Sequence, residues 1–202
     1  GQKMNKKKKA VFLDRDGVII RLLRGNEAYG LIYKREDLIL LPKGGQALEE
    51  LKKKGYLLIV FTNQPSIARG LISYEGVEEN HSFINKKLGG LIDAFYFCPH
   101  HPEMHPDVPE HAVKYRIPCD CRKPAPGMLI KAAKEFNIDF EKSWVIGDSI
   151  TDIAAGDSMK CKTILLKSVS NERINVSAAS FNRSVMPHKL ADNLLDATKY
   201  VD

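Results

Sequence analysis

The most constraining feature of the sequence is a short apolar run that stops at two carboxylates. Ala10 to Leu13 are four consecutive uncharged residues, a pattern that predicts a buried β-strand. Asp14 and Asp16 follow it, and the carboxyl end of a strand in an open parallel sheet lies at the edge where ligands bind. Two carboxylates this close repel each other unless a cation or a proton lies between them. The stretch predicts a ligand site, although a strand followed by a plain polar turn fits these residues equally well.

Apolar runs alternate with helical patterns along the rest of the chain. After the first strand, strands are predicted at 56–61, 94–97, 144–146, 163–166 and, at one edge of the sheet, 181–186. Helices are predicted at 44–54, 73–88, 127–136 and 153–159, with a last one through Leu190, Leu194 and Leu195. This alternation predicts a single doubly wound, Rossmann-like α/β domain with a central, mostly parallel sheet. The 202 residues suffice for that domain and leave no room for a large cap domain.

A long connection, Val18 to Leu41, follows the first strand. Connections of this length are unusual in compact domains and are commonly functional. Because it leaves the carboxyl edge of the strand, we expect it to form a cap or flap beside the site.

The positive charge of the chain is concentrated at its start. Residues 1–10 carry five lysines and no acidic residue, so most of the formal net charge of +6 belongs to this stretch. We interpret residues 1–9 as a disordered basic tail, with Gly1 to Lys3 left from cloning and Met4 as the natural start. A nucleic-acid-binding arm is the alternative for Lys6 to Lys9. The nearly neutral remainder of the chain argues against a nucleic-acid partner.

Composition indicates a globular protein, since 44% of the residues are hydrophobic and 28% are charged. No apolar run approaches the roughly 20 residues that a membrane-spanning helix needs, and no apolar segment typical of a signal peptide follows the basic start. Without a secretion signal, we expect the four cysteines to be reduced. These features predict a cytoplasmic protein that makes no membrane contact. We also expect a monomer, although no motif in the sequence bears on the oligomeric state.

Three predicted strands deliver polar side chains to one edge of the sheet, and a basic pair precedes a helix nearby. These residues are Asp14, Asp16, Thr62, Asn63 and Asp148 at the strands and Arg122 and Lys123 before the helix. Three carboxylates suit Mg²⁺, whereas an ammonium, a hydroxyl and an amide suit the equatorial oxygens of a phosphoryl group. Asp14 is placed to attack phosphorus and form an aspartyl-phosphate. Asp16 is placed to protonate the leaving oxygen and later to activate water.

These motifs resemble the four motifs of the haloacid dehalogenase-like phosphatases. The matching segments are Asp14-Arg15-Asp16-Gly17-Val18, Phe61-Thr62-Asn63, Lys123-Pro124 and Gly147-Asp148-Ser149-Ile150-Thr151-Asp152. The resemblance extends from residue 9 to about residue 166. It implies that Asp14 is the nucleophile and Asp16 the general acid and base. It also implies a Mg²⁺ ion bound by the Asp14 carboxylate, the Asp16 carbonyl and the Asp148 carboxylate.

The same resemblance assigns further residues. Thr62 and Lys123 would bind the phosphoryl oxygens, and Arg122 would also contact a substrate phosphate. We assign substrate binding to Arg15, Asn63, Gln64, Arg122 and Ser149. Asp152 would orient Lys123 or the metal, although an acidic residue at the start of a helix is also favoured by the helix dipole alone.

A second group of candidate ligands lies at the ends of the 98–121 loop, which is rich in Cys, His and Pro. A Cys₃His set matches a closed, tetrahedral structural zinc site, and the candidate ligands are Cys98, His100, Cys119 and Cys121. Unligated thiols are the alternative, and His101, His105 and His111 are rival ligands. The resemblance favours His100, because it lies two residues after the first cysteine. We expect a structural zinc that holds Arg122 and Lys123 against the site, and Cys161 as a small core residue.

The Cys-x-His and Cys-x-Cys-Arg-Lys-Pro segments narrow the match, together with Asn63-Gln64 and Ile67-Ala68-Arg69-Gly70. They resemble the D-glycero-D-manno-heptose 1,7-bisphosphate 7-phosphatases and the related histidinol-phosphate phosphatases. The resemblance implies hydrolysis of a small phosphorylated sugar in the synthesis of lipopolysaccharide heptose. Pro65 and Ser66 stand where that pattern has serine and glycine. Arg69 fits a substrate clamp and a surface salt bridge equally well.

Other functions are compatible with parts of this pattern. Histidinol-phosphate phosphatase is a close alternative, and nucleic-acid 3′-end phosphatases share the four motifs. An inactive, zinc-stabilised scaffold that binds partners would have at least one broken catalytic position, and every catalytic position is present here.

Overall fold

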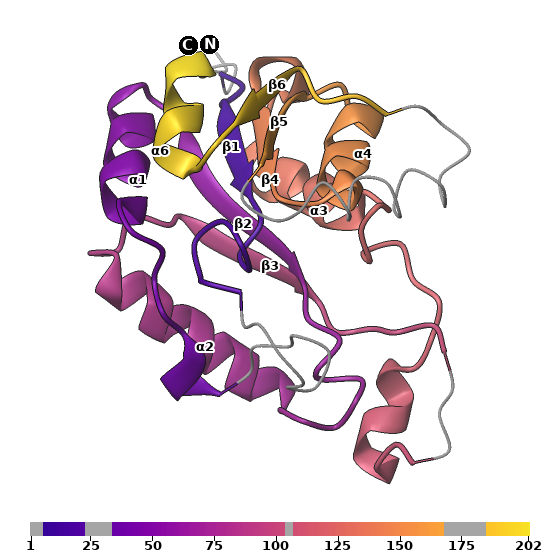
Figure 1. Cartoon of the computed structure of the whole chain (residues 1–202). Helices are drawn as coiled ribbons and strands as arrows, with labels where there is room; N and C mark the ends of the chain where they lie inside the picture. Colours follow the sequence, from indigo (N-terminus) through magenta and orange to yellow (C-terminus); the bar gives the residue numbers. More distant parts are fainter. Residues whose placement is uncertain (1–5, 23–33, 104–106, 168–184) are drawn as a thin grey trace, which may run out of the picture.

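The computed structural model describes residues 6–22, 34–103, 107–167 and 185–202. One sheet of six parallel strands forms its centre, in the order β3-β2-β1-β4-β5-β6 (Figure 1). The strands are β1 (Ala10–Leu13), β2 (Leu57–Asn63), β3 (Ala94–Cys98), β4 (Trp144–Gly147), β5 (Lys162–Leu166) and β6 (Lys189–Ala191). The prediction of a single α/β domain with a parallel central sheet is confirmed.

Helices cover both faces of the sheet (Figure 1). The α-helices are α1 (Gly44–Lys53), α2 (Tyr74–Lys87), α3 (Gly127–Phe136), α4 (Ile150–Ser158) and α6 (Leu194–Ala197). Short 3₁₀-helices are η2 (Arg35–Asp37), η3 (Glu110–Tyr115), η4 (Phe140–Lys142) and η5 (Thr198–Tyr200). Apolar side chains of α1, α2 and α6 form one core layer, and those of α3 and α4 pack on the opposite face.

Strand β1 shows why the sequence signal is so strong. Its four residues are fully buried and alternate between the two core layers, with Val11 and Leu13 in one layer and Ala10 and Phe12 in the other. A strand that is covered on both faces has no position for a polar side chain, which produces a continuous apolar run. The first polar residue of this segment, Asp14, therefore follows the strand immediately, and the packed core below it holds its backbone in place.

The strand order places a switch point beside β1. From β1 the chain winds outward through β2 and β3, and it then returns to the other side of β1 to form β4, β5 and β6. In doubly wound sheets, ligands bind at the carboxyl ends of the strands where this reversal occurs. The residues that follow β1 and β4 are thus expected to line a site.

The last strand lies later in the chain than predicted. Of the predicted 181–186 strand, residues 181–184 lie outside the described residues, and Val185 and Met186 belong to no strand. Leu190, predicted to be helical, lies in β6 opposite Leu165 of β5. The helix begins only after Asn193, whose side chain caps it by accepting a hydrogen bond from the Asp196 backbone N at 2.8 Å. Asparagine is a favoured N-cap residue, so Asn193 in the sequence is consistent with a helix that begins at Leu194.

The boundary of the predicted basic tail also needs correction. The Lys8 backbone N donates to the carbonyl of Asn137 at 2.9 Å, and the carbonyl of Lys8 accepts from Asp139 at 2.8 Å. Lys9 lies with its ammonium 4.2 Å from the centre of the Tyr56 ring. Residues 8 and 9 therefore belong to the packed body of the protein rather than to the tail.

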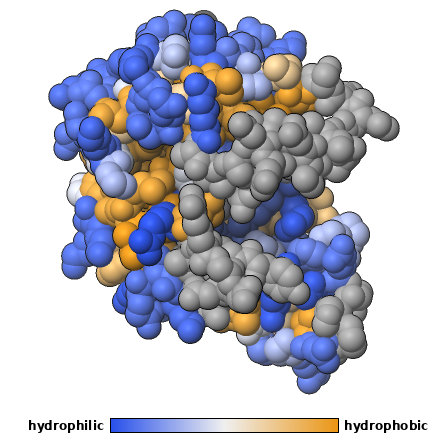
Figure 2. All heavy atoms as spheres, in the orientation of Figure 1, coloured by the Kyte–Doolittle hydropathy of each residue, from blue (hydrophilic) through white to orange (hydrophobic). Residues whose placement is uncertain are grey.

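The long connection after β1 is partly described. Val18, Ile19 and Ile20 are buried, and Ile20 pairs with Leu40 as it returns to the body. Figure 2 shows hydrophobic side chains gathered on the surface between α1 and α2. There the returning segment and α2 line a hollow of about 570 Å³, formed by Arg35, Glu36, Leu38, Ile39, Leu40, Phe83 and Lys87. The tip of the predicted flap, residues 23–33, lies outside the described residues, so the flap stays a prediction.

No helix among the described residues is long and apolar enough to cross a membrane.

Candidate active site

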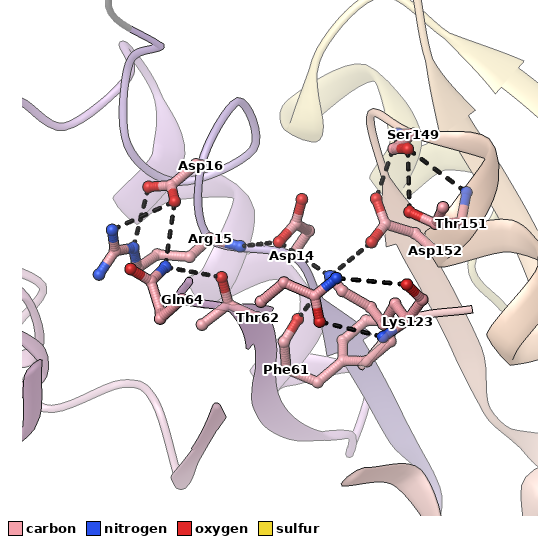
Figure 3. Close-up of polar contacts among 11 residues, drawn as sticks. Asp14, Arg15, Asp16, Phe61, Thr62, Gln64, Lys123, Ser149, Thr151 and Asp152 are labelled. Atoms are coloured by element: carbon pink, nitrogen blue, oxygen red, sulfur yellow. Dashed lines mark hydrogen bonds and ion pairs between the residues drawn. The ribbon is translucent and has the colours of Figure 1, made fainter. Parts of the chain in front are cut away.

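The parallel register brings residues that are far apart in the sequence to one edge of the sheet. Leu13 lies opposite Val60 of β2 and Ile146 of β4, so β1 and its two neighbours end at nearly the same level. The Asp14 backbone N donates to the carbonyl of Ile146 at 3.1 Å and fixes Asp14 beside the end of β4. Figure 3 shows Asp14 in the middle of the resulting polar cluster, with Thr62 on one side and Lys123 and Asp152 on the other.

Three buried carboxylates converge at this edge. Ligand oxygens of Asp14, Asp148 and Asp152 lie within 4.8 Å of one another. Burial, and then the negative charge of Asp14, raise the pKa of Asp148 to about 9. The same two causes raise the pKa of Asp152 to about 7, although Lys123 opposes them. A hard divalent cation relieves this repulsion by binding to carboxylate oxygens, so the donor set fits such an ion.

Lys123 is a buried cation at the centre of the cluster. Its ammonium donates to Asp14 Oδ1 at 3.0 Å, to Asp152 Oδ1 at 2.5 Å and to the carbonyl of Phe61 at 2.9 Å (Figure 3). Burial lowers the pKa of Lys123, but the charges of Asp14 and Asp152 outweigh it, and the net effect raises the pKa above its usual value. The ammonium is therefore charged and held in one position.

Asp152 has both of the roles that the sequence left open. One carboxylate oxygen accepts from Lys123, and the other accepts from the Ser149 backbone N at 3.1 Å. The Ser149 hydroxyl in turn accepts from the Thr151 backbone N at 3.3 Å, which completes a capping box at the start of α4. Since both oxygens of Asp152 are hydrogen bonded, Asp14 and Asp148 are the better candidates for metal ligands.

Asn63 and Arg122 hold the main chain on either side of Lys123. The Asn63 amide accepts from the Lys123 backbone N at 3.0 Å and donates to its carbonyl at 3.3 Å. Arg122 donates to the carbonyl of His100 at 3.4 Å and remains partly exposed. Asn63 is thus committed to the backbone of Lys123, a geometry that the sequence did not predict.

The Asp16 carboxylate lies apart from the acidic cluster. Arg15 donates hydrogen bonds to both of its oxygens: Nε donates to Oδ1 at 2.9 Å, and Nη2 donates to Oδ2 at 3.1 Å. Gln64 donates to the same Oδ2 at 3.1 Å and also to the Thr62 hydroxyl at 3.0 Å (Figure 3). The Arg15 side chain is fully buried. A substrate contact was predicted for Arg15, and this burial does not fit it; the guanidinium binds Asp16 instead.

His81 is a buried polar residue of this region that the sequence did not single out. His81 of α2 lies with Nε2 3.3 Å from Arg15 Nη1. The sequence indicated only that His81 lies on the apolar face of an amphipathic helix. A histidine in such a position is more often a core residue than part of a functional site.

The Cys and His residues converge as predicted. Donor atoms of Cys98, His100, Cys119 and Cys121 lie within 4.8 Å of one another, and all four cysteines of the chain are free thiols. His100 Nδ1 lies 3.3 Å from Cys121 Sγ and 3.6 Å from Cys98 Sγ. Three sulfurs and one nitrogen are the donor set of a tetrahedral structural zinc site, so this Cys/His cluster could hold a metal ion.

Two of the three rival histidines, His101 and His111, are outside this Cys/His cluster. His101 Nδ1 accepts from the Glu103 backbone N at 3.2 Å and lies 3.4 Å from Arg116 Nη1. His111 is exposed on η3, and His105 lies outside the described residues.

Comparison with known proteins gives close relatives. The D-glycero-β-D-manno-heptose-1,7-bisphosphate 7-phosphatase of Haemophilus ducreyi is 37% identical over 163 residues, which are 79% of this chain and 82% of the relative. The enzyme of the same name from Pasteurella multocida is 39% identical over 164 residues, with the same coverage of both chains.

The fold comparison agrees with these relatives. The crystal structure of the D,D-heptose 1,7-bisphosphate phosphatase from B. bronchiseptica, in complex with magnesium and phosphate, matches with a TM-score of 0.72 and 26% identity, covering 95% of this chain and 97% of that one. A sequence model of the HAD-hydrolase-like family matches residues 120–197. This chain therefore belongs to the haloacid dehalogenase-like phosphatase family that includes the D-glycero-β-D-manno-heptose-1,7-bisphosphate 7-phosphatases.

Proposed function

We propose that this protein is a Mg²⁺-dependent phosphatase that removes the 7-phosphate of D-glycero-D-manno-heptose 1,7-bisphosphate. The observation that carries the proposal is the contact between a buried ammonium and a buried carboxylate, Lys123 Nζ to Asp14 Oδ1 at 3.0 Å, at the switch point of the sheet. The names of the relatives support the substrate, and the magnesium and phosphate bound to the B. bronchiseptica enzyme support the chemistry.

Asp14 is the proposed nucleophile. Its carboxylate attacks phosphorus and the bond from phosphorus to the sugar oxygen breaks, which leaves an aspartyl-phosphate on Asp14. Two donors fix the orientation of Asp14 Oδ1, the Lys123 ammonium and the Arg15 backbone N at 2.8 Å. Lys123 offsets part of the negative charge on the attacking carboxylate and on the phosphoryl oxygens, and Thr62 at the end of β2 is the proposed hydroxyl contact.

Asp16 is the proposed general acid and base. In the first step its carboxyl proton passes to the departing sugar oxygen. In the second step the Asp16 carboxylate takes a proton from the water that attacks phosphorus, and inorganic phosphate leaves as Asp14 is regenerated. Arg15 and Gln64 hold the Asp16 carboxylate between these steps, so we propose a positioning role for Arg15 in place of a substrate contact.

Two metal sites follow from the donor sets. We propose that Mg²⁺ is held by the carboxylates of Asp14 and Asp148, which lie in the acidic cluster, and by the carbonyl of Asp16, the third ligand that the family resemblance implies. When bound, Mg²⁺ offsets the charge that otherwise keeps a carboxylate away from a phosphate. We propose that the Cys/His cluster holds a structural zinc, because it has four protein donors and no open position.

The remaining substrate contacts are assigned by position. Arg122 is partly exposed next to Lys123, and Ser149 is half-buried beside Asp152, so these two are the proposed contacts with the sugar and its phosphates. Asn63 supports them indirectly through the backbone of Lys123. Gln64 is buried and donates to Asp16 and Thr62, so its proposed role is to position Asp16, as for Arg15. The four free thiols suit a reducing compartment, and we propose that the protein acts as a monomer in the cytoplasm.

A panel of initial rates with Mg²⁺ tests the proposal. The substrates are both anomers of heptose 1,7-bisphosphate, histidinol phosphate and a 3′-phosphorylated oligonucleotide. We expect the highest kcat/KM on a heptose bisphosphate, and we expect Asp14→Asn to lower turnover at least about 10⁴-fold because the nucleophile is gone.

The panel separates two kinds of failure. A higher kcat/KM on histidinol phosphate or on the oligonucleotide would overturn the substrate and leave the chemistry. Retained turnover in a folded Asp14→Asn protein, or no turnover of any phosphomonoester by the unmodified protein, would overturn the chemistry itself.

A further inference from the structure

The Asp16 carboxylate is held by a chain of contacts that begins on α2. Arg15 makes a bidentate pair with Asp16, at 2.9 and 3.1 Å, and its side chain has no exposed surface. On its other side, Arg15 Nη1 lies 3.3 Å from His81 Nε2. The guanidinium therefore bridges a carboxylate at the site and an imidazole in the core.

The direction of the hydrogen bond between Arg15 and His81 is determined by the chemistry of arginine. A guanidinium has only donors, so Nε2 of His81 must be the acceptor, and the imidazole must be neutral. Burial, and then the positive charge of Arg15, lower the pKa of His81 to about 2. Both the geometry and the lowered pKa therefore make His81 a neutral acceptor at neutral pH.

Packing alone does not account for a histidine at this position. The ring stacks on Phe95 with centroids 4.6 Å apart and meets Phe97 edge to face at 5.5 Å. An apolar ring would fill the same space without a polar atom, whereas His81 Nδ1 is buried and has no hydrogen-bond partner among the described residues. An unpaired buried donor is unfavourable, so the contact of Nε2 with Arg15 is the feature that needs a histidine.

We propose that His81 is a positioning residue for the reaction. It accepts a hydrogen bond from Arg15, fixes the rotation of the guanidinium, and so aims the Asp16 carboxylate for proton transfer. The inference rests on the proposed function, because it assumes that Asp16 is the general acid. Without the acceptor, Arg15 keeps its charge, its burial and its pair with Asp16 but loses its contact with His81.

The test compares kcat/KM for two substrates whose leaving groups differ in their need for a proton from Asp16. A sugar alkoxide leaves only when it is protonated, whereas p-nitrophenolate leaves with little help, and kcat/KM reports the steps up to this departure. In His81→Phe, which keeps an aromatic ring and removes the acceptor, we expect kcat/KM on the heptose bisphosphate to fall about 10- to 100-fold. On p-nitrophenyl phosphate we expect a fall of about threefold or less.

Two further variants separate positioning from packing. His81→Gln loses the ring but has an amide oxygen at a similar reach, so we expect it to lower Tm and to keep the ratio of the two kcat/KM values close to that of the unmodified protein. Ile84→Ala removes a buried side chain of the same helix that lies in the core, and it should lower Tm without changing the ratio.

The outcomes are distinct. Equal falls on both substrates in His81→Phe would show that His81 only supports the fold and would overturn the inference. If that variant does not fold, His81→Asn replaces it: its shorter amide cannot reach Arg15, and an unchanged ratio there would overturn the inference as well. Absence of turnover in the unmodified protein would count against the proposed function instead.

Discussion

At the scale of single residues, the site is governed by an imbalance of charge. Asp14, Asp148 and Asp152 are buried together, and Lys123 is the buried ammonium that hydrogen bonds to Asp14 and Asp152. Burial alone makes each ionised carboxylate unfavourable, and proximity adds repulsion. Either protons or a cation must supply the missing positive charge, so the ionisation of Asp148 and the binding of Mg²⁺ should compete.

This competition predicts a pH-dependent effect of Mg²⁺ on stability. The folded-state pKa of Asp148, about 9, lies above its ordinary value of 3.8, so its proton stabilises the metal-free fold. That contribution is fully present below 3.8 and is lost as the pH rises through about 9. We expect Mg²⁺ to raise Tm more at about pH 8 than at about pH 5.5, with an apparent affinity that rises up to about tenfold per pH unit. Thermal melts with and without Mg²⁺ at several pH values measure this.

The control for this measurement is Asp148→Asn. The amide carries no titrating proton, so the dependence of the Mg²⁺ effect on pH should flatten and the affinity should fall. An increase in Tm on addition of Mg²⁺ that is the same at both pH values in the unmodified protein would contradict the competition.

Gly17 makes a second prediction at this scale. It has a φ of +87°, and a Cβ built there would lie 2.1 Å from Asp148 Oδ2. Gly17→Ala should therefore displace the Asp148 carboxylate, in addition to a backbone penalty of about 1–2 kcal/mol. We expect a lower free energy of unfolding and a weaker apparent Mg²⁺ affinity, read from denaturant melts and a Mg²⁺ titration of activity.

The matched control is Gly89→Ala. Gly89 also has a positive φ, +68°, but a Cβ there would have no neighbour within 4 Å. Its substitution should carry the backbone penalty alone and leave the Mg²⁺ affinity unchanged. Equal Mg²⁺ affinities in the two alanine variants would mean that the Asp148 carboxylate does not need a residue without a Cβ at position 17.

At the scale of elements, the Cys/His cluster connects two parts of the chain that both reach the site. Cys98 is the last residue of β3, and Cys121 lies two residues before Lys123. The amide of Asn63, at the end of β2, holds the backbone of Lys123 from the other side. The position of the ammonium thus depends on a loop with little secondary structure, and a metal ion is an effective way to order such a loop.

This arrangement predicts that loss of the metal lowers stability first and activity second. Cys119→Ser should reduce bound zinc from about one ion per chain to none and lower Tm, because a structural zinc site contributes directly to folding. We expect kcat/KM to fall about tenfold or more as Lys123 loses its support. Metal analysis in reducing buffer, thermal melts and initial rates are the measurements.

Cys161 supplies the matched control. It is a buried thiol outside the Cys/His cluster, so Cys161→Ser should lower Tm without releasing zinc. Absence of zinc from the unmodified protein in reducing buffer would refute the assignment of a zinc site to the 98–121 loop.

At the scale of the whole molecule, the site and the strongest positive charge lie at different places. The acidic cluster lies at the carboxyl ends of β1 and β4, whereas the lysine-rich start of the chain precedes the amino end of β1. Figure 1 shows that the described chain enters β1 at the end opposite the one that Asp14 follows. A nucleic acid bound at Lys8 and Lys9 would therefore lie at the end of β1 away from the proposed catalytic residues.

A truncation tests this separation. Deleting residues 1–7 removes Lys3, Lys6 and Lys7 but keeps the backbone hydrogen bonds that begin at Lys8. We expect Tm and kcat/KM on the heptose bisphosphate to be unchanged. If the tail binds single-stranded DNA at all, the slope of log affinity against log salt should become shallower by about 2. A loss of turnover on the sugar phosphate would show that the tail contributes to the site.

Much of this molecule follows from the sequence alone, because its information is local. The fully apolar strand Ala10–Leu13 requires a sheet covered on both faces, and the carboxyl ends of parallel strands meet at one edge. These two facts suffice to bring Asp14 and Asp148 together. The spacing of the cysteines at the two ends of the 98–121 loop predicted the Cys/His cluster, whereas the choice of His100 over the rival histidines came from the family resemblance.

Other features were decided only by tertiary structure, since they depend on side chains that meet across the core. The contact of Arg15 with His81 joins positions separated by 66 residues, and no local pattern reports that an arginine next to two aspartates is fully buried. The turn of the Asp16 carboxylate toward Arg15 and Gln64 follows from that burial. The pairing of Leu190 with Leu165 likewise depended on an open edge of β5, because a three-residue segment has too little periodicity to choose between strand and helix.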